Sequence, residues 1–425
     1  MAKARAYGAD ARLIAAVEAS YGVAPATGVY RSLDFKSTDL SSEQKLGEDP
    51  LLGRGRNAQD PYRGLISDEG SIEIPLDVRG IGFWLNALLG ASTTTPMAAA
   101  SGTLTFSAQP ADGSTITVIG VAFTFVDAAP GATDILIGAD LAATLVATSA
   151  KLNASANPLV AMATYDKTAT TITVVHDSPG AAGNTFTLAA SASSNGTPSG
   201  ATLVGGTSRH VFTSGAETLP SLTVEIGHPL LATPVFFRHT GTMVDSLDFD
   251  LGKEGAANAT CKLVAQGEDS FSTSIDAAPE PFALTRFSQG KGYIKRGTSF
   301  LAGVTAGRFS FSNTLERVRT IRDDGKIDGA DPTIATVKGS ITLRFDGATL
   351  LAEAASGDPI SLEYGFTSGS GHELSFLLPR VFLPKPKYKI SGPGGVEAAF
   401  DWQAAYDQES DTMLVVTLVN DVVAY

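Results

Sequence analysis

The sequence predicts a mainly β protein, built from a duplicated β-barrel or β-sandwich module with flanking helices and a small inserted α+β domain. The 425-residue chain contains 44 glycines and only 18% charged residues, a composition that favours strands and turns over long helices. Two stretches, 70–90 and 339–357, each begin with Gly-Ser-Ile, alternate apolar and polar residues, and end in an apolar segment between glycines. The chain is also too long for one ordinary hydrophobic core, so two or three domains are expected.

The first copy starts with an alternating strand, "YRSLDF", followed by a polar loop of about thirty residues over 36–70, far longer than a common hairpin loop. The next strand carries four apolar residues on one face, namely Ile72, Ile74, Leu76 and Val78. A helix is expected in "IGFWLNALL". A strand in "LPSLTVEIG" and a hairpin-like stretch over 243–267 complete the copy.

The second copy repeats this order. Its elements are the strand 307–312, a polar loop over 313–339, a strand with Ile341, Leu343 and Phe345 on one face, the helix "ATLLAEAAS", the strand "HELSFLLPRVFL", and a closing hairpin over 387–407. Five elements in the same order indicate a duplicated module. The alternative is that two unrelated β-domains merely share alternation and glycines.

Residues 97–207 are nearly free of charge and separate the parts of the first copy. The segment "STITVIGVAFTFV" predicts two strands, "ADLAATLVATSAKLNAS" predicts a helix with Asp140 as its N-cap, and "TTITVVHD" and "NTFTLAAS" predict two more strands. The expected domains are therefore a first module over 1–96 and 208–275, an inserted α+β domain over 97–207, and a second module over 276–425.

No catalytic or metal-binding constellation is predicted, and no cofactor is expected. The five histidines lack the close spacing of a local metal pair, and the single cysteine, Cys261, excludes a disulfide framework. The segment "DDGKIDGADPTIA" is similar to a calcium loop, but Lys326 and Ala335 replace acidic ligands. A net charge of −13 argues against a sequence-specific DNA-binding surface. Because no signal peptide or membrane span is recognised, we expect a soluble protein made in the cytoplasm.

Both long loops carry charges of both signs, which suits a polar interface with another subunit; a solvated loop is the alternative. The candidate residues in the first loop are Lys45, Glu48, Asp49, Arg54, Arg56 and Asp60. Those in the second are Glu316, Arg317, Arg319, Arg322, Asp323 and Asp324.

Several segments resemble the major tail tube proteins of long-tailed, siphovirus-like phages. These are "EASYGVAPATGVYRSLDF", "FWLNALLGASTTTP", "SRHVFTSGAETLPSLTVEIGH" and, most strongly, "FSFSNTLERVRTIRDDGKIDGADPTIATVKGSITLRF" with "VFLPKPKYKISGPGGVEAAFDWQAAYDQESDTMLVVTLVND". The resemblance implies a structural virion protein, not an enzyme, that stacks as rings into the tube through which the genome leaves. It also implies assembly in the host cytoplasm and contacts with tail terminator, distal tail and tape-measure proteins, with DNA only in transit and no membrane insertion.

Most tail tubes of this kind have rings of six single modules, so a two-module chain predicts a trimeric ring with pseudo-sixfold symmetry. A ring of six chains with the second module outside is the alternative. We further expect an acidic or neutral channel wall, and an inserted domain that projects outward and is dispensable for polymerisation. Two other classes remain open: a carbohydrate-binding or adhesin-like β-protein, and an enzyme with dispersed carboxylates.

Overall fold

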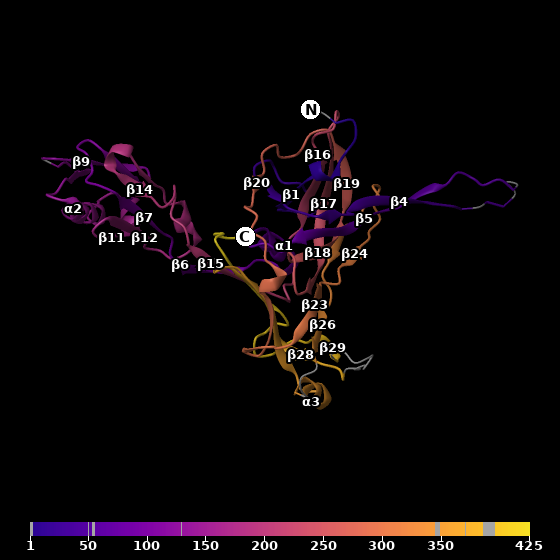
Figure 1. Cartoon of the computed structure of the whole chain (residues 1–425). Helices are drawn as coiled ribbons and strands as arrows, with labels where there is room; N and C mark the ends of the chain where they lie inside the picture. The colour runs from indigo at the N-terminus through magenta and orange to yellow at the C-terminus, as the bar shows by residue number, and fades with distance from the viewer. Residues whose placement is uncertain are drawn as a thin grey trace. The chain divides into compact units, whose positions relative to one another are not determined.

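The computed structural model describes residues 3–49, 51–52, 56–128, 130–344, 349–369, 371–385 and 396–425. Over these residues the protein is mainly β, with three α-helices. The chain divides into two compact units, which are treated separately below (Figure 1). Unit 1 comprises Met1–Ser92 and Val211–Leu418, and unit 2 comprises Thr93–His210 and Val419–Tyr425.

The first half of unit 1 is an antiparallel arrangement around one long strand. In order of pairing, its strands are β1 (Arg12–Val17), β16 (Leu222–His228), β17 (Val235–Leu251), β18 (Asn258–Ala265) and β5 (Tyr62–Pro75), with β3 (Ser37–Thr38) and β4 (Ser41–Gly47) along the outer edge of β5. Helix α1 (Gly80–Leu89) follows β5.

The second half of unit 1 repeats this order of pairing. Its strands are β21 (Gly292–Arg296), β27 (Ile360–Thr367), β28 (Glu373–Phe382), β29 (Glu397–Ala404), β26 (Thr336–Arg344) and β23 (Val304–Ser312). Helix α3 (Thr349–Ser356) follows β26, as α1 follows β5. The predicted duplication is therefore confirmed at the level of topology, but two of its predicted matches are wrong. The counterpart of β16 is β27 and not the strand at 372–383, and the counterpart of β23 is the edge formed by β3 and β4 and not the strand at 30–35.

The two halves also agree residue by residue in their strand registers. Ile72 of the first Gly-Ser-Ile lies opposite Thr38 on one side and Cys261 on the other. Ile341 of the second lies opposite Gly307 and Phe400 at the corresponding positions. Even the irregularities correspond, because the β16–β17 register shifts between Leu222 and Val224 and the β27–β28 register shifts between Ile360 and Leu362.

This correspondence explains why both copies begin with glycine. A Cβ atom at Gly70 would lie 2.5 Å from the Cα of Leu40 on the neighbouring edge. At Gly339 a Cβ would collide with the backbone carbonyl oxygen of Arg308 and would lie 2.5 Å from a ring carbon of Trp402. Glycine is the residue that allows such a close approach of neighbouring backbones.

Helix α1 forms where the sequence predicted it, because both of its ends are satisfied locally. The Asp77 carboxylate accepts hydrogen bonds from the backbone N–H groups of Arg79, Gly80 and Ile81, at 3.1, 2.8 and 2.9 Å. Gly90 ends the helix with φ of 89°, a left-handed conformation that glycine adopts without strain. The helix is buried nearly all round and belongs to the core of unit 1.

The long loop predicted over 36–70 is wrong, and the one predicted over 313–339 is right only in part. Residues 36–70 contain β3, β4 and most of β5, and the outer part of the β4–β5 hairpin extends as an arm from the other strands of unit 1 (Figure 1). Residues 313–339 contain the short hairpin of β24 (Glu316–Val318) and β25 (Gly329–Asp331) and the start of β26. A strand that is exposed on both faces does not need to alternate apolar and polar residues. Because this alternation is what identifies a half-buried strand in a sequence, exposed strands such as β4 are not recognised by it.

Unit 2 contains helix α2 (Leu141–Asn153) and two four-stranded sheets around an apolar core. One sheet holds β7 (Ser101–Phe106), β11 (Ala163–Lys167), β12 (Thr171–His176) and β14 (Gly196–Pro198); the other holds β8 (Thr115–Val118), β9 (Val121–Val126), β10 (Asp134–Leu136) and β13 (Leu188–Ala190). Asp140 caps α2 as predicted, because its carboxylate accepts from the Ala143 N–H at 2.8 Å. The predicted strand in "NTFTLAAS" is shorter than expected, since only Leu188–Ala190 is extended in a sheet.

The remaining elements are short or peripheral. The strands are β2 (Arg31–Leu33), β6 (Thr93–Ala98), β15 (Thr207–Thr213), β19 (Gly267–Phe271), β20 (Glu280–Pro281), β22 (Ser299–Phe300) and β30 (Val415–Asn420). The 3-10 helices are Gly8–Asp10, Val160–Met162, Ala181–Thr185, Ala192–Ser194 and Gln289–Lys291. Within the described ranges, no helix has the length and apolar character needed to cross a membrane.

Candidate functional site

A continuous antiparallel sheet runs through both modules of unit 1. It follows the order β3/β4, β5, β18, β17, β23, β26 and β29. The two modules meet where the C-terminal part of β17 pairs with β23, from Ser246 opposite Ser312 to Leu251 opposite Gly307. We call this pairing the internal joint.

One face of the sheet is apolar and fixes the internal joint in place. Leu247 and Phe249 of β17 lie opposite Phe311 and Phe309 of β23, and all four side chains are buried. The rings of Phe249 and Phe309 stack with centroids 4.9 Å apart. Because this packing is continuous with the core on both sides, the joint is held by buried apolar surface as well as by backbone hydrogen bonds.

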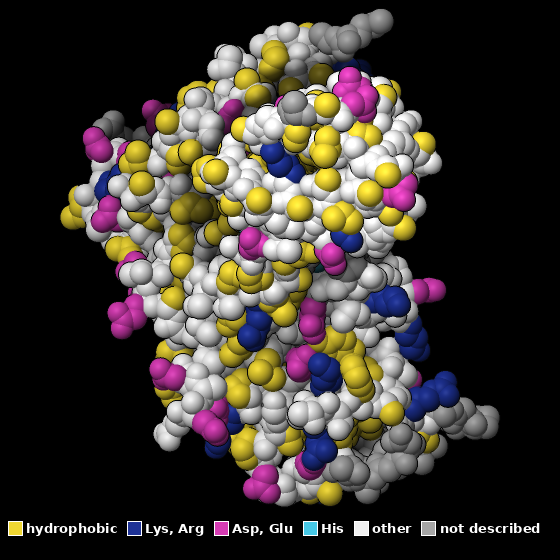
Figure 2. All heavy atoms as spheres, turned by 90° about the vertical axis from the view of Figure 1, so that its left-hand side faces the viewer, with side chains coloured by type: hydrophobic (Ala, Val, Ile, Leu, Met, Phe, Trp, Pro, Cys, Tyr) yellow, Lys and Arg dark blue, Asp and Glu magenta, His cyan; other side chains and the backbone are white. Residues whose placement is uncertain are grey.

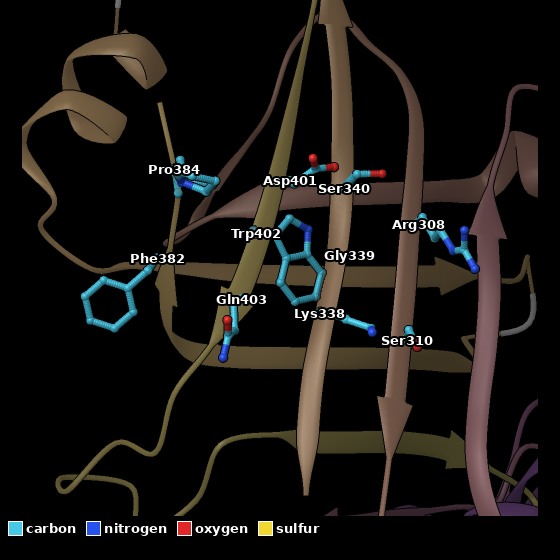
Figure 3. Close-up of a pocket in the computed structure, with 11 residues that line it drawn as sticks. Arg308, Ser310, Lys338, Gly339, Ser340, Phe382, Pro384, Asp401, Trp402 and Gln403 are labelled. Atoms are coloured by element: carbon cyan, nitrogen blue, oxygen red, sulfur yellow. The ribbon is translucent and has the colours of Figure 1, made fainter. Parts of the chain in front are cut away.

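The opposite face of the sheet is polar, and carboxylates outnumber basic side chains on it. The strand registers place the following acids there: Asp39, Glu43, Glu69, Glu73, Asp248, Asp250, Glu397 and Asp401. The basic residues are Lys262, Arg308, Lys338 and Arg344. Figure 3 shows part of this face, with Asp401, Ser340 and Arg308 in one row across three strands, and Gln403, Lys338 and Ser310 in the next.

A groove of about 740 Å³ opens on the polar face of the second module (Figure 3). It lies between the rows just described and the end of β28, where Phe382, Leu383 and Pro384 contribute its apolar side. Phe382 corresponds to Met243 of the first module. Val381 and Thr242 occupy equivalent positions in the two registers, and Phe382 and Met243 are the residues that follow them.

In the first module, another segment of the same chain packs over Met243. Met243 and Val264 form a small buried cluster with Ile327 and Ala330, which belong to the segment 313–335. The same segment is attached to the first module by hydrogen bonds. Leu315 N–H donates to the Asp245 carboxylate at 2.9 Å, and Ile66 N–H donates to the Gly325 carbonyl at 2.9 Å.

The interface residues proposed from sequence fall into two groups. On the arm, Lys45, Glu48, Asp49, Arg56 and Asp60 are exposed, and Arg54 lies outside the described residues. In the segment 313–335, Arg317 forms an ion pair with Glu69 of β5, and Arg322 pairs with Asp324 and Asp328 at 2.7 and 2.8 Å. Glu316, Arg319 and Asp323 are exposed.

The structure therefore brings Arg322 and Asp324 together, but it does not unite the two predicted groups into one site. The Arg322 guanidinium holds the pKa of the Asp324 carboxyl well below its usual range. Sequence reasoning missed several charges on the polar face of the sheet, including Asp39 and Glu43 on its edge and Arg308 on the interior strand β23. Aligning the two copies through their Gly-Ser-Ile motifs would have placed these residues at comparable positions.

Two groups of buried polar residues in unit 1 have structural partners. The Glu18 carboxylate accepts from the hydroxyls of Ser221 and Thr223, both at 2.7 Å, and from the backbone N–H groups of Gly22 and Gly241. His239 lies 2.9 Å from the Asp68 carboxylate, and both side chains are fully buried. Such satisfied networks are typical of a β-core.

The described residues also lack the clusters expected of a metal centre, since no three His, Cys, Asp or Glu side chains among them are placed to hold an ion. Cys261 is buried, and burial raises the pKa of its thiol, so it is not a reactive nucleophile. On the face drawn in Figure 2, charged side chains of both signs are intermingled and neither forms a continuous patch.

Comparison with protein families identifies the molecule. The family model described as phage tail tube protein matches residues 8–230 and 200–404, which together cover most of the sequence. A search of the curated proteins found no match. The chain is mainly β and has two modules that share an extended polar sheet face. Because the family model matches nearly its full length, the chain belongs to the phage tail tube protein family.

Proposed function

We propose that this structural tail tube protein stacks as rings and that the polar face of its continuous sheet lines the channel for the phage genome. The observation that carries the proposal is the internal joint, which gives the two modules one uninterrupted polar face. The excess of carboxylates on that face suits DNA transit, because clustered Lys and Arg would bind phosphates and slow the passage.

A ring of three chains follows from the same observation. Each chain carries two modules of equal topology, and the internal joint supplies one lateral contact between modules. Three chains then provide six module positions, with three internal joints and three joints between chains. Half of the lateral contacts become intramolecular and benefit from a high effective concentration.

The arm and the inserted segment serve other contacts in this proposal. The charged arm, formed by the outer part of the β4–β5 hairpin, reaches the neighbouring ring, whereas residues 97–207 project outward and are dispensable for polymerisation. The tube ends contact tail terminator and distal tail proteins, and a tape-measure protein occupies the lumen during assembly. The site of action is the virion tail, after assembly in the host cytoplasm.

Helical cryo-electron microscopy of the purified, assembled protein tests the ring. We expect threefold symmetry with three chains per ring and a pseudo-sixfold inner wall formed by the polar face. Sixfold symmetry with six full chains per ring would refute the trimer, and a continuously positive channel wall would refute the assignment of the lumen.

Removal of the insertion tests the outward domain. A variant in which Thr95 is joined to Ser208 by a short linker should still form tubes visible by negative-stain microscopy. If that variant stays monomeric while the full chain polymerises, the inserted segment belongs to the assembly interface.

A further inference from the structure

We propose that residues 44–48, at the base of the arm, dock on the polar face of the second module of another copy of this chain, with Leu46 against Phe382 and Glu48 paired with Lys338. The inference rests on the proposed ring and goes beyond it, because it names the two surfaces that meet between chains and the charges that select them. Residues 44–48 are called the arm base below.

The arm base is the counterpart of the first residues of the segment 313–335. In the first module Ser41 lies opposite Glu69, and in the second module Ser310 lies opposite Lys338 at the equivalent position. An equal number of residues separates the two partners in each module. The arm base therefore corresponds, residue by residue, to the start of the segment that packs over the first module.

The pairing farther out along the two hairpins agrees as well. Gly47 opposite Tyr62 in the arm corresponds to Glu316 opposite Asp331 in the β24–β25 hairpin. The β4–β5 register shifts within the arm base, and at the corresponding position β23 ends and β24 begins. Since such an irregularity bends a strand, the arm can turn at the same place as its counterpart.

The counterpart of the arm base makes two kinds of contact with the first module. Leu315 packs against the buried cluster that contains Met243 and Val264. Arg317, two residues farther on, forms an ion pair with Glu69 of β5. The second module thus covers the polar face of the first module across the internal joint, through one apolar and one charged contact.

The second module presents the equivalent surface. Phe382 occupies the position of Met243, and Gln403, which lies opposite Lys338, occupies the position of Val264, which lies opposite Glu69. Phe382, Lys338 and Gln403 all line the groove described above (Figure 3). Lys338 and Gln403 are exposed, and Phe382 is partly exposed.

The occupant of this groove must come from another copy. The arm leaves the sheet at its β3/β4 edge, whereas the groove lies over β26, β28 and β29 at the opposite end of the same sheet. In the proposed ring, the first module of one chain adjoins the second module of the next. The arm base then covers that second module as 313–335 covers the first, and the tip of the arm can still extend to the neighbouring ring.

The side chains of the arm base fit this role. Leu46 stands where Leu315 stands in the counterpart, and 65% of its surface is exposed in the single chain. Docking it against Phe382 removes apolar surface from water. Glu48 stands in the place of Arg317, so the ion pair of Arg317 with Glu69 within the chain becomes a pair of Glu48 with Lys338 between chains, with the signs exchanged.

This exchange of signs disfavours the wrong arrangements. An arm base on the first module of another copy would place Glu48 against Glu69. The segment 313–335 on a second module would place Arg317 against Lys338. Like charges at such a contact oppose both arrangements, so first and second modules alternate around the ring.

Glu48 and Lys338 provide the charge test, because both are exposed in the described structure. We expect Glu48→Lys and Lys338→Glu each to raise the critical concentration for tube formation roughly tenfold, because each places like charges in contact. The double variant Glu48→Lys/Lys338→Glu should return to within about twofold of the unmodified chain. Asp166→Lys, on an exposed position of a strand in unit 2, controls for the change of net charge.

Leu46 provides the apolar test, and the same hairpin offers a matched control. Leu65 is 53% exposed, but its counterpart in the second module, Ile334, is 82% exposed and is not packed against the first module. Leu46→Ser should therefore raise the critical concentration roughly fivefold, whereas Leu65→Ser should leave it within about twofold.

Critical concentration is measured by sedimentation, with negative-stain microscopy to identify tubes and circular dichroism to verify folding. Unchanged assembly of both single charge variants would overturn the inference, as would a double variant no better than either single one. Equal effects at Leu46 and Leu65 would also overturn it. Those results would leave the proposed tube intact, whereas failure of the unmodified chain to form tubes would refute the proposed function as well.

Discussion

Substituting alanine for Gly70 should destabilise unit 1 measurably, and the same change at Gly339 should destabilise it more. The new Cβ at residue 70 would lie 2.5 Å from the Leu40 Cα, about 0.9 Å short of the 3.4 Å at which ordinary contact begins. The clash involves backbone, so it is relieved only when the edge strand moves away from β5. That movement weakens the hydrogen bond from Asp39 N–H to the Ser71 carbonyl.

The expected magnitudes follow from the position of each glycine in the sheet. Overpacking costs about 1–3 kcal/mol, so the free energy of unfolding should fall by about 2 kcal/mol for Gly70→Ala, whose clash is with an edge strand. Gly339 lies between β23 and β29, both of which have further strands beyond them, so neither neighbour can move freely. We expect Gly339→Ala to cost about 4 kcal/mol, at the upper end of single-residue effects.

Denaturant unfolding of the unpolymerised protein, followed by tryptophan fluorescence, measures both values. The chain has two tryptophans, Trp84 and Trp402, and both lie in unit 1. Gly252→Ala is the control, because nothing lies within 4 Å of its would-be Cβ, and its change should stay within about 0.5 kcal/mol. If either sheet glycine behaves like Gly252, or if Gly70→Ala is the more harmful change, the steric explanation of the repeated motif is refuted.

Two further predictions concern a helix cap and a titration. Asp140→Ala should cost unit 2 about 1 kcal/mol, seen as faster hydrogen exchange in α2, because the cap to Ala143 N–H is lost. Burial raises the pKa of Asp77, so its carboxyl contributes stability that is fully present below its unfolded pKa and is lost as pH rises through the folded pKa. The free energy of unfolding of the unmodified chain, relative to Asp77→Asn, should therefore fall as the pH rises above about 4, the ordinary pKa of an aspartate, and a difference that rises with pH would contradict this.

The sequence predicted those elements whose burial leaves a periodic pattern. The alternation at Ile72 and Ile74 marked β5, the apolar run before Gly90 marked α1, and Asp140 marked the start of α2. The arm could not be found in this way, because β4 is exposed along nearly its whole length and its side chains follow no apolar period. The predicted face of the second strand was right for Ile341 and Leu343, which are buried, and Phe345 lies outside the described residues.

The candidate site was harder to predict than the fold, because it depends on which strands become neighbours. The charged residues proposed from sequence were chosen as members of long polar segments, and the structure disperses them over the arm and the packed segment. Asp250 and Arg308 are far apart in sequence and meet only because β17 pairs with β23. Long-range pairing of this kind follows from the registers of the whole sheet and not from any local pattern.

Because the strand registers of the two modules correspond, the sequence of one module can be aligned with that of the other. The two modules have corresponding strand registers, so each residue of one module can be compared with its counterpart in the other. Where both modules keep the same residue, as in Gly-Ser-Ile, the requirement is geometric and applies to each module alone. Where they differ by sign, as between Arg308 and Asp39, the surroundings differ too, because Arg308 lies opposite Asp250 in the internal joint whereas Asp39 lies on the edge that pairs with β5.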